Sequence, residues 1–241
     1  MPFLITFLAG CSTLIGYFFI YFNNRNNRVL ISSLGFASGV MFFISIFDLI
    51  PESIICFNDN YFLFFSLILS FLFISIGMMF SNFIDNKLPN NSNLYKAGMI
   101  SMIALVIHNV PEGIVTFLTS NHNISLGITL AISIALHNIP EGISISVPIY
   151  YSTRSKKKAF LYTFISGMSE FIGAVIAFLL FRKFDNNFFF GCLYSLTSGI
   201  MLYISVVELL PTSLKYKNKL CTYIFFIIGI IFIYISIKIV K

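Results

Sequence analysis

The stretch HNVPEG at residues 108–113 recurs almost unchanged as HNIPEG at residues 137–142. The two copies use two of the chain's three histidines and two of its five glutamates. Both copies lie inside long apolar runs, where an ionisable side chain is costly to keep and marks a functional position. The duplication therefore predicts two related sites buried in one apolar framework.

The composition indicates an all-α integral membrane protein. The chain has 241 residues, of which 58% are hydrophobic and 10% charged, and its mean hydropathy is +0.91. Soluble domains carry about 25% charged residues. The net charge of +6 comes from basic residues in short loops between apolar runs, which is typical of topology signals and not of a nucleic-acid-binding surface. The partner that this pattern indicates is the lipid bilayer.

Eight apolar runs match the length of about 20 residues that a membrane-spanning helix needs. They predict a single transmembrane domain over residues 1–241, with spans at 2–22, 29–57, 61–84, 97–119, 124–150, 158–181, 188–213 and 220–240. The second and fifth runs are long and contain Pro51, Pro140 and Pro148, so we expect these helices to kink or to end early.

The distribution of basic residues predicts the orientation. Loops after spans 1, 3, 5 and 7 carry eleven of them: Arg25, Arg28, Lys87, Lys96, Arg154, Lys156, Lys157, Lys158, Lys215, Lys217 and Lys219. The opposite side has four: Arg182, Lys183, Lys238 and Lys241. The positive-inside rule then places both termini of this multi-pass membrane protein outside the cytoplasm.

A second repeat relates residues 37–53 (ASGVMFFISIFDLIPES) to residues 197–213 (TSGIMLYISVVELLPTS). Eight of the seventeen positions are identical at a constant offset of 160, and Asp48 falls opposite Glu208. These segments lie in spans 2 and 7, and the HNxPEG copies lie in spans 4 and 5, so each pair is antiparallel. We expect one inverted symmetry that relates spans 1–4 to spans 5–8, an arrangement typical of transporters.

The depth of the polar residues groups them. At 1.5 Å per residue, His108, His137 and Glu170 each lie about 17–20 Å into their spans, near the middle of a core about 30 Å thick. By the same count Asp48 and Glu52 lie near the outer mouth and Glu208 near the inner one.

The paired motif has the residue types of a divalent-metal site. On a helix, residues i and i+4 share a face, so His108 points the same way as Glu112, and His137 the same way as Glu141, with Asn109 and Asn138 beside them. Two imidazoles and two carboxylates suit zinc, with Fe(II), Mn(II), Co(II) and Cd(II) as competitors. Glu170 and the asparagine oxygens leave capacity for a second ion or for a proton. The predicted metal residues are His108, Asn109, Glu112, His137, Asn138, Glu141 and Glu170, and the predicted pathway residues are Asp48, Glu52 and Glu208.

Structural interpretations compete for single residues. A lone membrane histidine or glutamate often only joins helices, and Asp48, Glu52 and Glu208 could be solvated helix ends. His122 is interpreted as a solvated loop residue. The cysteines Cys11, Cys56, Cys192 and Cys221 are scattered and predict neither a disulfide framework nor a thiolate site.

Two other functions use the same ligands. An intramembrane metallohydrolase needs a general base beside the metal, commonly as HExxH, whereas asparagine follows each histidine here. A metal receptor that does not transport would bind without flux. The interpretation adopted is a transporter and not an enzyme.

The residues resemble those of the ZIP divalent-metal transporters: eight spans, HNxPEG in spans 4 and 5, and SGMSE at 166–170. The chain looks closest to the bacterial ZupT type, and this resemblance implies a place in the cell membrane, whereas the sequence alone leaves an organelle membrane open. The resemblance implies import of zinc and related divalent cations as substrates, with no cofactor. It implies a main site at His108, Glu112, His137 and Glu141, an adjoining second site with Asn109, Asn138 and Glu170, and Asp48 and Glu208 on the entrance and exit routes. A homodimer is a reasonable assembly. The two mouths differ, because Thr212 stands where symmetry with Glu52 would place a glutamate.

Overall fold

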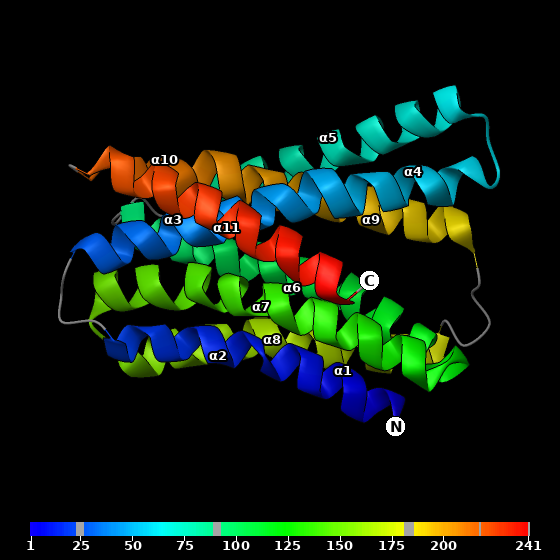
Figure 1. Cartoon of the computed structure of the whole chain (residues 1–241), viewed down its shortest axis with the longest axis horizontal. Helices are drawn as coiled ribbons and strands as arrows, with labels where there is room; N and C mark the ends of the chain where they lie inside the picture. The colour runs from blue at the N-terminus through cyan, green and yellow to red at the C-terminus, as the bar shows by residue number, and fades with distance from the viewer. Residues whose placement is uncertain (23–26, 89–92, 181–185, 217, 241) are drawn as a thin grey trace.

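The computed structural model describes residues 1–22, 27–88, 93–180, 186–216 and 218–240, which form helices joined by short turns (Figure 1). Within these residues eight helical segments are long and apolar enough to cross a membrane, which confirms the predicted all-α, eight-span fold. Of the basic residues used for the orientation, Arg25, Arg182, Lys183, Lys217 and Lys241 lie outside the described residues.

Three of the eight spans are divided into shorter helical elements. The first consists of α1 (Pro2–Cys11), α2 (Thr13–Tyr17) and η1 (Phe18–Phe22); the second of α3 (Asn27–Ile44), η2 (Ser45–Leu49) and α4 (Ile50–Asn58); the seventh of α9 (Asn187–Tyr203), η3 (Ile204–Leu209) and α10 (Leu210–Leu214). The others are single helices: α5 (Leu63–Lys87), α6 (Asn93–His122), α7 (Ile124–Thr153), α8 (Lys156–Leu180) and α11 (Lys219–Val240).

The spans pack as two groups of four. Spans 1, 4, 5 and 6 pack together around α6, α7 and α8, and spans 2, 3, 7 and 8 pack together around α3 and α9. In Figure 1, α1, α2 and α8 lie low in the view, whereas α4, α5 and α10 lie above. The groups meet mainly where α3 packs against α7 and α9 against α6.

Close contacts at glycines reveal the inverted symmetry. A side chain at Gly113 would run into the backbone of Glu170, and one at Gly142 into the backbone of Thr13. Further glycine contacts correspond in the same way. Gly10 and Gly167 approach each other, and the other contacts come in symmetry-related pairs: Gly16–Ile139 with Gly173–Val110, Gly39–Phe226 with Gly199–Ile74, and Gly77–Leu196 with Gly229–Phe36. The two halves correspond as predicted, but in permuted order, because span 4 matches span 5 and spans 1, 2 and 3 match spans 6, 7 and 8.

Spans 2 and 7 each contain one wide helical turn at symmetry-related positions. The N–H of Ile50 bonds to the carbonyl of Ser45, and that of Leu210 bonds to the carbonyl of Ser205, five residues back in each case. A proline follows each turn, at Pro51 and Pro211, and it can neither donate to the preceding turn nor fit against it. Such π-turns are frequent at functional sites.

Buried serines join these two turns across the symmetry axis. Ser38 Oγ donates to the Ser205 carbonyl at 3.0 Å, and its counterpart Ser198 donates to the Ser45 carbonyl at 3.2 Å. Each of these carbonyls also accepts the N–H that closes its own wide turn, so the serine hydroxyl gives it a second hydrogen bond and ties span 2 to span 7.

The prolines of the fifth span do not shorten it, contrary to the prediction of an early end. The helix α7 runs unbroken through Pro140 and Pro148 to Thr153. The packing of α7 between α6, α8 and α2 supports the helix on several sides. His122 is also not in a loop: it is the exposed last residue of α6, and the Asn123 side chain caps α7 by accepting from the N–H groups of Ser125 and Leu126.

Candidate metal centre

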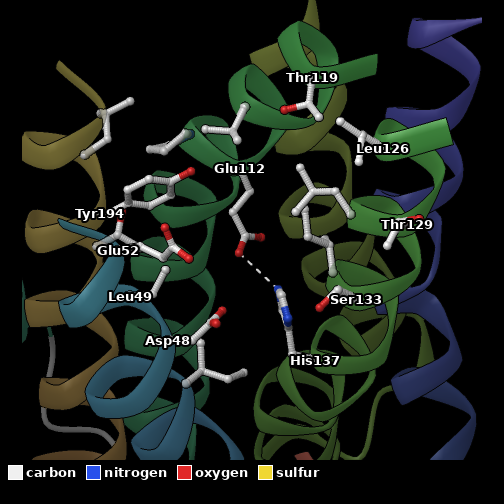
Figure 2. A pocket seen from close by; sticks show the side chains of 17 residues that line it. Asp48, Leu49, Glu52, Glu112, Thr119, Leu126, Thr129, Ser133, His137 and Tyr194 are labelled. Carbon is white, nitrogen blue, oxygen red and sulfur yellow. Dashed lines mark hydrogen bonds and ion pairs between the residues drawn. The ribbon is translucent and has the colours of Figure 1, made fainter. Parts of the chain in front are cut away.

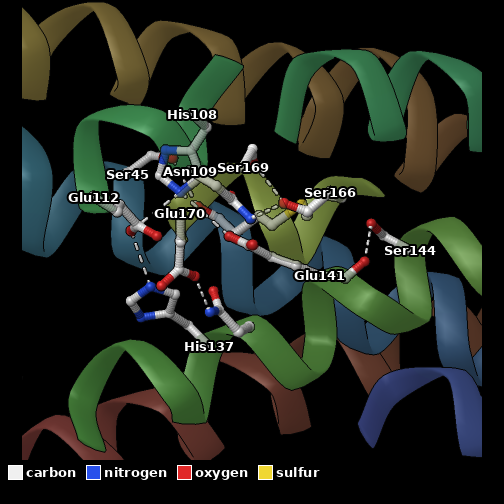
Figure 3. Close-up of polar contacts among 12 residues, drawn as sticks. Ser45, His108, Asn109, Glu112, His137, Glu141, Ser144, Ser166, Ser169 and Glu170 are labelled. Carbon is white, nitrogen blue, oxygen red and sulfur yellow. Dashed lines mark hydrogen bonds and ion pairs between the residues drawn. The ribbon is translucent and has the colours of Figure 1, made fainter. Parts of the chain in front are cut away.

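The two HNxPEG copies meet where α6 and α7 cross (Figure 3). His108 Nε2 lies 3.2 Å from Glu112 Oε1 in the same copy and 3.3 Å from Glu141 Oε1 in the other. His137 Nε2 lies 3.0 Å from Glu112 Oε1. Glu112 therefore contacts both imidazoles. His108 and Glu141 are fully buried, whereas 11% of the Glu112 side chain is exposed.

A second polar layer adjoins this one and comes from α6, α7 and α8. The buried Asn109 amide donates to the Ser166 carbonyl at 3.1 Å. The buried Asn138 amide donates to the Ala9 carbonyl at 3.0 Å and also to Glu170 Oε1. These bonds use the N–H groups and turn the amide oxygens toward the remaining space.

Several buried acceptors of the centre have no hydrogen-bond donor among the described residues. They are Asn109 Oδ1, Glu112 Oε2, Asn138 Oδ1, Glu141 Oε1 and Oε2, and Glu170 Oε2; both nitrogens of His108 also lack a hydrogen bond. Each such atom costs about 1–3 kcal/mol when it is buried without a partner. Oxygen and imidazole lone pairs gathered in this way suit a divalent cation.

The side chains are not already arranged around one point. Within the described part of the chain, no three His, Cys, Asp or Glu side chains form a ready set of metal ligands. Instead the imidazoles and carboxylates contact one another at 3.0–3.3 Å. An arriving cation would have to replace these contacts.

A cavity of about 370 Å³ leads to the centre (Figure 2). Glu112 and His137 lie at its inner end, and Thr119 and Leu126 line it near the turn between α6 and α7. Each of the eight spans runs opposite to the one before it, so the turn after the fourth span lies at the same end of the bundle as both termini. Beyond the centre, in the other half of α6 and α7, the buried side chains of Leu105, Ile145 and Ile149 belong to the main hydrophobic core.

Asp48 and Glu52 line the wall of this cavity opposite His137, beside Tyr194 (Figure 2). The structure thus brings them to the same cavity as Glu112 and His137. Glu208 lies elsewhere, at the opposite end of the bundle, where it interacts with Asp85 and Lys96. Among the predicted site residues, Glu208 is therefore the one apart from the others.

Sequence reasoning missed several cavity residues. Tyr194, Thr197, Thr129 and Ser133 contribute hydroxyls to the lining. Thr197 is the first residue of the repeated segment 197–213, and this position in a repeat could have marked it as a candidate. Nothing in the apolar sequence around Tyr194 indicates that it faces a cavity.

An inverted repeat of eight membrane-spanning helices, with acids and imidazoles buried where two proline-containing helices cross beneath a cavity, defines a membrane transporter. The sequence model of the ZIP zinc transporter family matches residues 88–236. The chain belongs to the ZIP zinc transporter family, whose members are transporters and not enzymes.

Similar proteins cover nearly the whole chain. The zinc transporter ZupT of Clostridium perfringens is 38% identical over 252 residues, covering 90% of this chain and 87% of that protein. The zinc transporter ZupT of Streptococcus mutans is 38% identical over 239 residues, covering 92% of this chain and 90% of that protein. The zinc transporter ZupT of Campylobacter jejuni is 33% identical, with 89% of this chain covered and 88% of that protein.

Proposed function

We propose that this transporter imports zinc, and with it Fe(II), Mn(II), Co(II) and Cd(II), into the cytoplasm through the centre between α6, α7 and α8. The whole chain is then one transport domain. The observation that carries the proposal is the group of buried acceptors without donors on Asn109, Glu112, Asn138, Glu141 and Glu170. A divalent cation would be a partner for these oxygen lone pairs and would offset the negative charge of the carboxylates.

The order of events follows from the cavity. A cation enters from the side of the termini, passes Asp48 and Glu52, and reaches Glu112, the carboxylate that lines the cavity and contacts both imidazoles. It displaces the imidazole–carboxylate contacts and is then held by His108, Glu112, His137 and Glu141. Glu170, with the oxygens of Asn109 and Asn138, holds a second cation or a proton. Release requires the half of α6 and α7 beyond the centre, which is packed around Leu105, Ile145 and Ile149, to open.

The direction rests on the distribution of charge. Lys87, Arg154, Lys156, Lys157 and Lys158 all lie at the end of the bundle opposite to the termini. Cytoplasmic loops carry such an excess of basic residues, so the cavity faces the outside of the cell membrane. The homodimer remains a prediction.

The test is zinc influx into liposomes that contain the purified protein and a trapped zinc indicator, beside Glu141→Ala. We expect saturable influx in the original protein and at least about tenfold slower influx in the variant, because a buried carboxylate contact of about 1.5–3 kcal/mol is lost. Zinc binding without influx would make the protein a receptor. Undiminished influx in the variant would move the pathway away from the centre.

Glu52 allows a separate prediction about the cavity wall. Glu52→Gln should raise the external zinc concentration for half-maximal influx about two- to fivefold and leave the maximal rate unchanged, because a partly screened carboxylate in a cavity concentrates cations without holding them. The influx is measured at low and high ionic strength. A difference between variant and original protein that persists at high salt would mean that Glu52 binds the ion directly.

A further inference from the structure

The inner end of the bundle holds a charged network that the transport centre does not use. Lys96 Nζ, at the start of α6, lies 2.7 Å from Asp85 Oδ1, near the end of α5. Tyr203 donates its hydroxyl to Asp85 Oδ2 at 2.9 Å and to Asn82 Oδ1 at 3.3 Å. The buried Glu208 of η3 lies near enough to Asp85, Lys96 and Lys215 to be influenced by their charges.

This network joins the two groups of helices. Lys96 belongs to span 4, whereas Asp85, Tyr203 and Glu208 belong to spans 3 and 7. Its members are mostly removed from solvent: Glu208 is 9% exposed, and the side chains of Lys96 and Asp85 are 20% and 13% exposed. Charges in such a place are screened by salt much less than surface charges.

The positions that inverted symmetry relates to Asp85, Lys96 and Lys215 carry no charged side chain in the described part of the chain. The offset of 160 places Glu208 opposite Asp48, so each mouth has one acid at this position. The paired glycine contacts also give the difference in residue number between matching positions of the other spans. It is 152 between spans 3 and 8, which places Asp85 opposite Ile237. It is 29 between spans 4 and 5, which places Lys96 opposite Ser125. Lys215 stands opposite Ile55 in the same way.

The two mouths therefore differ in charge although their backbones match. At the outer mouth, which has the carboxylates of Asp48 and Glu52, Ser125 and Ile55 stand where symmetry with Lys96 and Lys215 would place lysines. The inner mouth has the carboxylates of Asp85 and Glu208 together with the ammonium groups of Lys96 and Lys215. A cation that leaves the centre meets two acids whose negative charges the ammonium groups of Lys96 and Lys215 offset.

We propose that Lys96 is a tethered cation that occupies the acidic inner mouth and competes there with the transported ion. By balancing Asp85 and Glu208, Lys96 keeps this mouth from retaining a divalent cation, so that the ion passes into the cytoplasm. The proposal rests on the proposed function, because it assumes that the ion leaves by this end. It adds Asp85 and Lys96 to the residues that set the rate of release.

The experiment combines zinc influx into liposomes with zinc retained per protein after desalting. Lys96→Met removes the ammonium and keeps the chain length. We expect its maximal influx to fall about tenfold while zinc retained per protein rises, because the two carboxylates then hold the ion. Lys96→Arg keeps the charge and should retain most of the influx.

Asp85→Asn distinguishes this role from a purely structural ion pair. It leaves Lys96 with Glu208 alone, so we expect influx near that of the original protein and no added zinc retention. In the double variant Lys96→Met with Asp85→Asn, influx should recover several-fold over Lys96→Met alone. Equal losses in both single variants without added retention, or no effect of Lys96→Met, would overturn the proposal.

Two controls complete the design. Lys87→Met removes an exposed ammonium group of the same end, which lies over the Phe83 ring and outside the network, and should leave influx and retention unchanged. The original protein and Glu141→Ala are measured in the same liposomes. Absence of influx in the original protein would contradict the proposed function itself, a result distinct from failure of the Lys96 variants.

Discussion

Glu112→Gln should lower the efficiency of zinc influx by about 100-fold, equal to about 2.7 kcal/mol. Glu112 Oε1 lies 3.2 Å from His108 Nε2 and 3.0 Å from His137 Nε2, so this carboxylate links the two copies of the motif. It also lines the cavity through which, in the proposed pathway, the ion reaches the centre. Glutamine keeps the shape of the side chain but supplies neither the charge nor a second anionic oxygen.

The measurement is the initial rate of influx over a range of external zinc concentrations, with Asp59→Asn as the control. Asp59 accepts a hydrogen bond from Asn187 at the end of the bundle that carries the termini, so its loss removes one carboxylate outside the centre. The control should stay within about twofold of the original protein, as expected for an exposed polar contact. A Glu112→Gln variant with more than half of the original efficiency would contradict the role given to this carboxylate.

The eight spans and the central cluster were predictable for simple physical reasons. A membrane fixes the length of an apolar run, and the duplication of HNxPEG is visible as sequence identity. The spacing of His108 and Glu112 on one helical face then defined half of the cluster, and the second copy supplied the other half. The structure brings His108, Asn109, Glu112, His137, Asn138, Glu141 and Glu170 together as this reasoning expected.

Contacts between spans without sequence identity were not predictable. Counting residues along a helix gives depth but not the direction in which a side chain faces. For this reason Asp48 was placed near a mouth, and its position across the cavity from His137 had to come from the packing of spans 2 and 5. Asp85, Lys96 and Tyr203 converge from three spans, and no motif connects them.

At several symmetry-related positions, the two halves of the chain have residues of different charge. Glu170 in span 6 has Thr13 of span 1 as its counterpart, since Gly113 approaches the former and Gly142 the latter. Glu52 is matched by Thr212 in the same way. A strictly symmetric chain would present the same residues at both ends, whereas these substitutions, with Lys96, give the two halves different polar and charged residues at matching positions.

Gly113→Val is expected to have the largest effect on folding. The three nearest atoms to a side chain at this position all belong to the Glu170 backbone, which cannot move without moving α8. The helices α6 and α8 would separate, and Glu170 would leave the centre. We expect destabilisation of more than about 3 kcal/mol, above the usual 1–3 kcal/mol for overpacking, and loss of zinc influx.

Gly98→Ala is a milder variant on the same helix, because its added carbon would lie 2.7 Å from Cγ1 of Ile149 and 3.2 Å from the nearest backbone atom, whereas one at Gly113 would run into the Glu170 carbonyl oxygen. Thermal unfolding of both variants in detergent is compared, with Gly142→Val as the symmetric counterpart of the first. The inverted repeat requires Gly142→Val to resemble Gly113→Val, since its side chain would meet the Thr13 carbonyl at the equivalent crossing. Similar midpoints for Gly113→Val and Gly98→Ala would show that backbone contact at Gly113 does not set the spacing of α6 and α8, and the centre would then need another support for Glu170.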